Sequence, residues 1–180
     1  MTATQPMRDI SASPATSVEV LISDLNGREA DIRTVVEAQP QILNHNVETV
    51  PRLQRPVRRR ARWDRSVSVL AAGRAVAREI GYDALVTKTG LMVGLGETWE
   101  ELVEAMQLLR AADIDVLTIG QYLRPSRQHL PLRRYYTPAE FMSLRRIGLE
   151  MGFRHVQSGP LVRSSYHAAE QVPGQAAAAV

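Results

Sequence analysis

The stretch that decides the fold is residues 84–109, ALVTKTGLMVGLGETWEELVEAMQLL. Its first ten residues form a mostly apolar run that is typical of a buried strand, and Gly94 and Gly96 close that run. Thr98 is followed three residues later by Glu101, which is the capping-box pattern at the start of a helix. Apolar residues then recur at helical spacing. The stretch therefore predicts one strand–turn–helix unit.

The same unit recurs on both sides of this stretch. Strands are expected at 18–22, 42–47, 84–93, 116–119 and 153–157, and helices at 28–38, 64–80, from 98 onward and from 137 to 151. This βαβαβαβαβ order predicts an α/β fold with about five parallel strands, alternating with four helices through right-handed crossovers. Either a complete doubly wound sheet or an arc of a (β/α) barrel fits the pattern. The stretch around Pro51 and Pro56 is expected to be irregular.

Composition limits the class of protein. The chain has 180 residues, 44% hydrophobic and 23% charged, which is typical of one soluble domain. No apolar stretch is long enough to span a membrane, and the absence of a secretory signal favours the cytoplasm. Residues 1–17 and 169–180 are expected to be flexible ends. With no cysteine, the chain has no thiolate of its own to bind an iron–sulfur cluster.

Polar residues follow the predicted strands, where parallel α/β folds bind ligands. The densest group is Asn44, Asn46 and Glu48, which could hydrogen-bond a polar ligand or form only an Asn-rich strand exit. Neighbouring His45 is expected to be a hydrogen-bonded histidine and not a metal ligand. A site for a polar ligand is therefore predicted at this edge of the sheet.

Two further features have alternative interpretations. Lys88 lies inside an apolar strand, so its amine must point into a polar cavity or pair with a carboxylate. The turn containing Gly94, Gly96 and Glu97 resembles a phosphate-binding loop but lacks the usual spacing, so an ordinary strand-to-helix turn is favoured. Both features lie near the predicted site.

Arginines are concentrated between residues 52 and 65, at positions 52, 55, 58, 59, 60, 62 and 65. Only Trp63 interrupts them with an aromatic ring, and the net charge of the whole chain is only +3. A surface for nucleic acid would usually combine basic and aromatic groups. A solvated loop, or a loop that contacts an acidic partner, is therefore favoured over nucleic-acid binding.

Several motifs together resemble the lipoyl synthase family from residue 18 to residue 168. They are VEVLISDLNG (18–27), NHNVETVPRL (44–53), TKTGLMVGLGET (87–98), DVLTIGQYLRPSRQHLPL (115–132) and TPAEFMSLRRIGLEMGFRHVQSGPLVRSSYHA (137–168). The resemblance implies a partial (β/α) barrel and a radical S-adenosylmethionine enzyme with two [4Fe–4S] clusters. It also implies insertion of two sulfur atoms into an octanoyl chain, which is carried by a lipoyl-acceptor protein domain.

The resemblance also implies roles for particular residues. It places S-adenosylmethionine against Asn44, Asn46, Glu48, Lys88, Gly94, Gly96 and Glu97. It makes Ser165 a ligand of the auxiliary cluster, with Ser164 as the second choice. It assigns no catalytic residue to this chain.

The main departure from the family is the lack of both cysteine motifs, which lie in the family's N-terminal half. Residues 18–168 therefore resemble the C-terminal portion of a lipoyl synthase. Because a serine cannot replace three thiolates, we expect the isolated chain to hold no stable cluster and to be inactive in sulfur insertion. Two alternatives are a degenerate module that binds S-adenosylmethionine or the acceptor domain, and half of a split enzyme completed by a cysteine-bearing chain.

Overall fold

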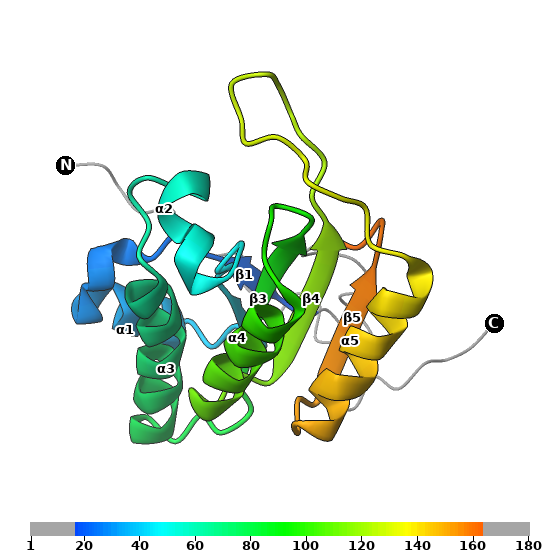
Figure 1. Cartoon of the computed structure of the whole chain (residues 1–180). Coiled ribbons are helices and arrows are strands. Elements are labelled where there is room, and N and C mark those ends of the chain that lie inside the picture. Colours follow the sequence, from blue (N-terminus) through cyan, green and yellow to red (C-terminus); the bar gives the residue numbers. More distant parts are fainter. Residues whose placement is uncertain (1–16, 164–180) are drawn as a thin grey trace.

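The computed structural model describes residues 17–163. Within them five strands form one parallel sheet (Figure 1). The strands are β1 (Glu19–Leu21), β2 (Ile42–Asn44), β3 (Val86–Val93), β4 (Val116–Gln121) and β5 (His155–Gly159). Each strand is hydrogen-bonded to the next one in the chain, in the order β1-β2-β3-β4-β5. This agrees with the predicted element order.

The strand order also distinguishes the two architectures that the sequence left open. A doubly wound sheet reverses direction at a switch point, whereas here the order never reverses. Right-handed crossovers of constant direction place all the connecting helices on one side, and Figure 1 shows them together on one face of the sheet. These helices are α1 (Glu29–Glu37), α3 (Trp63–Glu79), α4 (Trp99–Ala111) and α5 (Pro138–Glu150). The predicted arc of a (β/α) barrel is confirmed.

The expectation of an irregular stretch around the prolines was wrong. The structure has a 3₁₀ turn at Pro51–Leu53, followed by the short helix α2 (Gln54–Val57). Pro51 takes the first position of the turn, where its fixed φ favours helical geometry. Pro56 lies in the first turn of α2, where a backbone N–H would have no partner within the helix.

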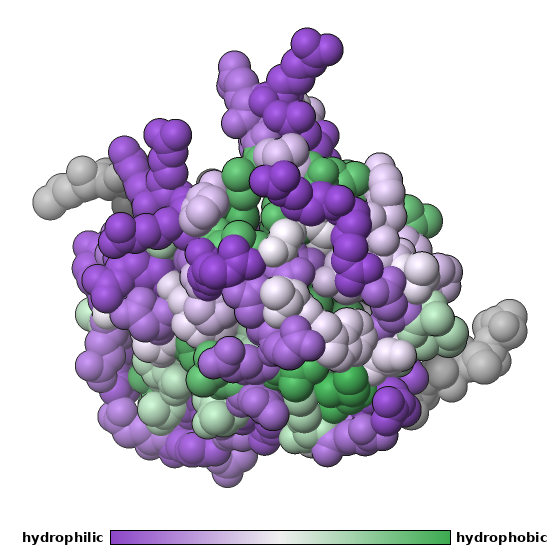
Figure 2. All heavy atoms as spheres, in the orientation of Figure 1, coloured by the Kyte–Doolittle hydropathy of each residue, from purple (hydrophilic) through white to green (hydrophobic). Residues whose placement is uncertain are grey.

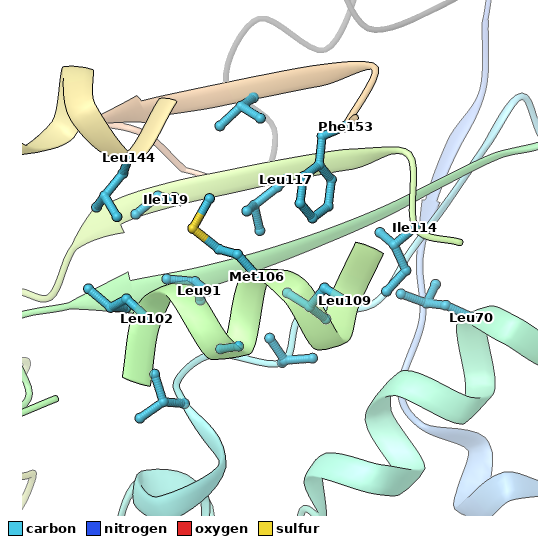
Figure 3. Close-up of a cluster of buried hydrophobic side chains, with 14 of the residues drawn as sticks. Leu70, Leu91, Leu102, Met106, Leu109, Ile114, Leu117, Ile119, Leu144 and Phe153 are labelled. Carbon is cyan, nitrogen blue, oxygen red and sulfur yellow. The ribbon is translucent and has the colours of Figure 1, made fainter. Parts of the chain in front are cut away.

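The hydrophobic core lies between the sheet and its helices. Figure 3 shows Leu91, Leu117 and Ile119 of the sheet facing Met106 and the other apolar residues of α4. These four named residues are 3% exposed or less, so burying them removes apolar surface from water. This packing fixes α4 against the two central strands.

The opposite, inward face of the sheet is more polar. Side chains alternate along a strand, so Lys88, Gly90 and Met92 lie on the face away from Leu91. Strand register then places Asn44 beside Lys88, and Thr118 beside Gly90, on that same face. Among the described residues, no helix is long and apolar enough to cross a membrane.

Candidate functional site

A recess of about 200 Å³ lies at the carboxyl ends of β2, β3 and β4. Asn46, Glu48, Gly90 and Thr118 contribute to its walls, together with Met92, Gly120, Leu123, Val162 and Arg163. Two of the residues predicted from sequence, Asn46 and Glu48, therefore share one site. The recess lies where ligand sites occur in parallel α/β folds.

The backbone after β2 turns both of these side chains toward the recess. The sheet ladder is interrupted at Asn46 and resumes at Glu48, whose N–H donates to the carbonyl of Gly90 over 2.9 Å. The hydroxyl of Thr89 bridges the interruption: it donates to the carbonyl of His45 over 2.8 Å and accepts the N–H of Val47 over 3.2 Å. A buried hydroxyl thus replaces the missing ladder bonds.

The absence of a side chain at Gly90 keeps the recess open. A Cβ there would lie 2.6 Å from Thr118 Oγ1 and 2.9 Å from Asn46 Oδ1. Asn46 Oδ1 is buried and has no hydrogen-bond partner. An unsatisfied buried acceptor is energetically unfavourable, so a ligand that donates a hydrogen bond to it would be stabilised.

Glu48 is the acidic group of the recess. Burial raises the pKa of its carboxyl group, while nearby Arg58 and a hydrogen bond from the Asn46 side chain oppose that rise. One oxygen of Glu48 lies 3.8 Å from Arg58 Nη1. Its backbone is also strained, with φ of +69°, a region that residues other than glycine rarely adopt. Such strain is common at functional sites.

Lys88 and Asn44 lie on the same face but do not line the recess. Lys88 is completely buried, and its Nζ pairs with Glu19 Oε2 over 2.9 Å. Asn44 Nδ2 donates to the other oxygen of Glu19 over 2.6 Å. Burial lowers the pKa of Lys88, and the hydrogen bond and charge of Glu19 oppose that effect. Of the two predicted environments for Lys88, the structure shows pairing with a carboxylate.

The turn after β3 is filled by its own acidic residue. Glu97 is buried, and its carboxylate accepts the N–H of Gly94 over 2.6 Å and that of Leu95 over 2.9 Å. Gly94 has φ of +100°, and a Cβ there would lie 2.5 Å from the carbonyl oxygen of Arg134. These two amides are therefore committed to Glu97. The favoured interpretation as a strand-to-helix turn agrees with this geometry.

A larger groove of about 680 Å³ adjoins the recess. The two share Glu48, Met92 and Leu123, and most of the other groove walls are apolar, including Val57, Leu95, Tyr122, Pro125 and Leu130. The β4–α5 loop, residues 122–137, forms one side of the groove, and the segment around α2 forms the other. A polar recess and an apolar groove thus form one continuous depression.

Gln121 anchors the β4–α5 loop at its base. Its Nε2 donates to the carbonyls of Val93 and Arg134, and its Oε1 accepts the N–H of Tyr136 over 2.9 Å. Tyr122 adds a hydrogen bond from its hydroxyl to the carbonyl of Leu130 over 2.9 Å. The loop is therefore held beside the groove by buried side chains.

His45 is a structural residue in this arrangement. Its ring is buried, with Nδ1 2.9 Å from the carbonyl of Ile22 and Nε2 3.1 Å from Ser66 Oγ. Burial lowers the pKa of His45. The neutral ring, donating from Nδ1 and accepting at Nε2, satisfies both contacts.

The segment after β5 closes one side of the recess. The carbonyl oxygen of Val162 lies 2.4 Å from where a Cβ on Gly120 would be, so only glycine fits beneath it. Arg163, the last described residue, lines the recess. Ser164 and Ser165, for which a metal-binding role was predicted, lie outside the described residues.

Several residues of the site were not predicted from sequence. Thr118 and Leu123 reach the recess only because β4 lies beside β3, and Glu19 reaches Lys88 from a strand 69 residues away. Gly90 could have been predicted, because side chains alternate along a strand and Gly90 must therefore lie on the same face of β3 as Lys88.

The resemblance implies two kinds of cofactor, S-adenosylmethionine and iron–sulfur clusters, and the residues present suit only the first. The buried acceptor of Asn46, the carboxylate of Glu48 and the space above Gly90 fit a ligand that carries ammonium or hydroxyl donors, as S-adenosylmethionine does. An iron–sulfur cluster does not fit, because the sequence has no cysteine to supply thiolates. Among residues 17–163, no three His, Asp or Glu side chains form a metal-binding group either.

The fold and the site together define a class: an α/β protein built as an arc of a (β/α) barrel, with a candidate ligand site in a recess at the carboxyl ends of its strands. In sequence, the chain is similar to lipoyl synthases. It is 55% identical to lipoyl synthase of Bacillus cytotoxicus over 160 residues, 89% of this chain and 52% of that protein. For Koribacter versatilis the values are 56% identity over 158 residues, 88% of this chain and 50% of that protein.

The resemblance read from the sequence motifs is therefore confirmed, and the chain spans about half the length of the curated relatives it matches. No family model matches the chain. Among solved structures, a radical S-adenosylmethionine methyltransferase from Kitasatospora setae aligns with a TM-score of 0.45 and 15% identity. That alignment covers 61% of this chain and 22% of the other, and the likeness is too slight to support an argument.

Proposed function

We propose that this chain supplies the S-adenosylmethionine-binding part of a lipoyl synthase, the enzyme that inserts sulfur into a protein-bound octanoyl chain. The observation that carries the proposal is the buried, unpaired Oδ1 of Asn46 in the same recess as the Glu48 carboxylate. Both groups are acceptors, and S-adenosylmethionine offers an ammonium group and ribose hydroxyls as donors.

The shape of the depression supports the same ligand. The recess alone is smaller than the range of about 300–1,000 Å³ typical of ligand pockets, whereas the groove lies within that range. We therefore place the polar part of the ligand against Asn46 and Glu48, and its flatter, less polar adenine against the groove at Leu95 and Tyr122. Lys88 and Asn44 support this site from the layer below, and Glu97 shapes the turn at its edge.

The proposal divides the reaction between two sets of residues. This chain would bind and orient S-adenosylmethionine, and the thiolates for the clusters would come from another polypeptide. Two [4Fe–4S] clusters bound by that polypeptide would supply the chemistry, one the electron that cleaves S-adenosylmethionine and the auxiliary one the sulfur that is inserted. Ser165 is the residue we propose as this chain's contribution to the auxiliary cluster.

Binding of S-adenosylmethionine to the purified chain, measured by isothermal titration calorimetry, tests the first part. Asn46→Ala and Glu48→Gln should each weaken binding at least tenfold, because each removes an acceptor inside the recess. Glu104→Gln is the matched control, since Glu104 is exposed on α4 and makes no ion pair with a described residue. Wild-type chain that fails to bind S-adenosylmethionine at millimolar concentration would overturn the proposal.

Sulfur insertion tests the second part. We expect the isolated chain, supplied with S-adenosylmethionine, reductant and an octanoylated acceptor domain, to form no lipoyl product detectable by mass spectrometry. Iron and sulfide analysis after anaerobic reconstitution should likewise show less than one cluster per chain. Product formed by the isolated chain would show that ligands other than cysteine assemble the site.

The second candidate function is a non-catalytic module that binds the acceptor domain or S-adenosylmethionine. The same depression favours it, because binding needs no thiolate. Adding a cysteine-bearing N-terminal half of a lipoyl synthase separates the two: restored sulfur insertion supports the split enzyme, and binding without restored activity supports the module.

A further inference from the structure

The charges at the carboxyl ends of the strands are unevenly distributed. Residues 51–62 contain six arginines and residues 122–136 contain four, and neither segment contains Asp or Glu. Both segments contribute residues to the groove walls, and Figure 1 shows the two segments at the same end of the molecule. An electropositive rim therefore surrounds its mouth.

Most arginines on the helices are neutralised locally. Arg33 pairs with Glu79, Arg78 with Asp113 and Arg146 with Glu150. Six arginines of the two segments are exposed and form no ion pair with any described residue; we name these the rim arginines, Arg55, Arg59, Arg60, Arg124, Arg127 and Arg133. Most of the exposed, unpaired arginines among the described residues therefore lie in the two segments beside the groove.

The tip of the β4–α5 loop is preorganised. Arg124 donates from Nε to the carbonyl of His129 over 2.9 Å and from Nη2 to the carbonyl of Arg127, and Ser126 Oγ lies 2.9 Å from His129 Nδ1. These bonds hold the tip in one shape while the guanidinium groups stay exposed. A preformed surface loses less conformational entropy when a partner binds.

We propose that the rim arginines form a docking surface for an acidic face of the protein domain that carries the acyl chain, an inference that rests on the proposed function. An acyl chain attached to a protein can reach the part of the depression beside S-adenosylmethionine only if its carrier lies against the rim. Figure 2 shows hydrophilic residues on both projections at this end of the molecule, with hydrophobic residues between them. Opposite charges would steer the carrier and orient it over the groove.

The exposed residues of the rim favour a protein over a nucleic acid. Single-stranded nucleic acids are bound by basic groups combined with exposed aromatic rings on which the bases stack. In the two segments the only exposed aromatic side chain is Tyr135, at the far end of the loop. Leu123 and Pro125, also exposed, add apolar surface beside the arginines instead.

The test compares two double charge reversals that change the net charge equally. R59E/R127E alters the rim. The control R145E/R154E alters Arg145 on α5 and Arg154 just before β5, which are also exposed and make no ion pair with described residues. Binding of a purified octanoylated lipoyl-acceptor domain is measured by calorimetry at 50 and 300 mM salt. We expect the rim variant to bind at least tenfold more weakly at 50 mM, the control within about twofold of wild type, and wild-type binding to weaken with salt.

Three results would overturn the inference. These are acceptor binding unaffected by the rim reversal, equal loss in both variants, and rim-dependent binding of a 20-nucleotide RNA that is tighter than binding of the acceptor. S-adenosylmethionine binding, measured on the same samples, separates this inference from the proposed function. Loss of acceptor docking in R59E/R127E with retained S-adenosylmethionine binding supports the rim, whereas a wild type that binds acceptor but not S-adenosylmethionine overturns only the proposed function.

Discussion

Lys88 Nζ lies 2.9 Å from Glu19 Oε2, although the two residues are 69 positions apart in the chain. Strand β2 lies between their strands, so the pair joins β1 to β3 across it. The lysine is fully buried, and the glutamate side chain is 18% exposed. This ion pair therefore holds the edge strand β1 to the central strand β3.

Removing only one partner of this pair should be costly. Glu19→Gln leaves the buried ammonium of Lys88 without its counter-charge, and we expect the free energy of unfolding at pH 7 to fall by about 3 kcal/mol in urea titrations. The double variant Lys88→Met/Glu19→Gln should recover most of that loss. Because burial already lowers the pKa of Lys88, the deficit of Glu19→Gln should shrink as pH rises toward 10. A single variant as stable as wild type would contradict this account.

Acid should destabilise α4 through Glu101. The hydrogen bond from Arg52 and the N–H of Thr98 lower the pKa of Glu101 from 4.5 to about 2. A lowered pKa in the folded state contributes stability above about pH 4.5, and that stability is lost as pH falls toward 2. Thermal unfolding between pH 5 and 2.5 should show a shallower acid dependence in Glu101→Gln than in wild type. The control Glu104→Gln should follow wild type, and parallel curves for all three would refute the prediction.

Filling the space above Gly90 should block the recess. In Gly90→Ala the new Cβ would crowd Thr118 Oγ1 and Asn46 Oδ1, so we expect S-adenosylmethionine affinity to fall at least tenfold by calorimetry. Gly148→Ala is a matched control, because its Cβ would meet Val156 at 2.8 Å in the helix–sheet core. Each variant should cost about 1–3 kcal/mol of stability from overpacking. Equal affinity in both variants would mean that the recess is not the binding site.

The N-terminus of α5 depends on its cap. Thr137 Oγ1 accepts the N–H of Glu140, and Glu140 accepts the N–H of Thr137 in return. We expect Thr137→Ala to lower the free energy of unfolding by about 1 kcal/mol and Thr137→Ser to restore most of it. Urea unfolding monitored by circular dichroism measures both. A serine variant no better than alanine would argue against the cap.

The order of elements could be predicted from sequence because each signal is local. Thr98 with Glu101, and Thr137 with Glu140, mark helix starts within four residues, and both capping boxes are present in the structure. The prediction of an irregular stretch at Pro51 and Pro56 was wrong, because a proline excludes the middle of a helix but favours its first turn. Strand β2 is shorter than predicted, since the ladder is interrupted at Asn46.

The candidate site could be predicted only in part. Asn46 and Glu48 lie two residues apart and share the recess, so a single strand end brought them together. Asn44 and Lys88, predicted for the same site, lie one layer below it with Glu19. Which layer a side chain joins depends on strand register, and register depends on packing between strands that are distant in sequence.

The sequence by itself determined the alternation of strands and helices, the lack of thiolates and the similarity to lipoyl synthases, because these follow from local pattern and composition. Only the tertiary structure decided between the doubly wound sheet and the barrel arc, gave Lys88 its carboxylate, and placed two arginine-bearing loops across one groove. The physical reason is that strand order, register and crossover handedness bring together residues that have no relation along the chain.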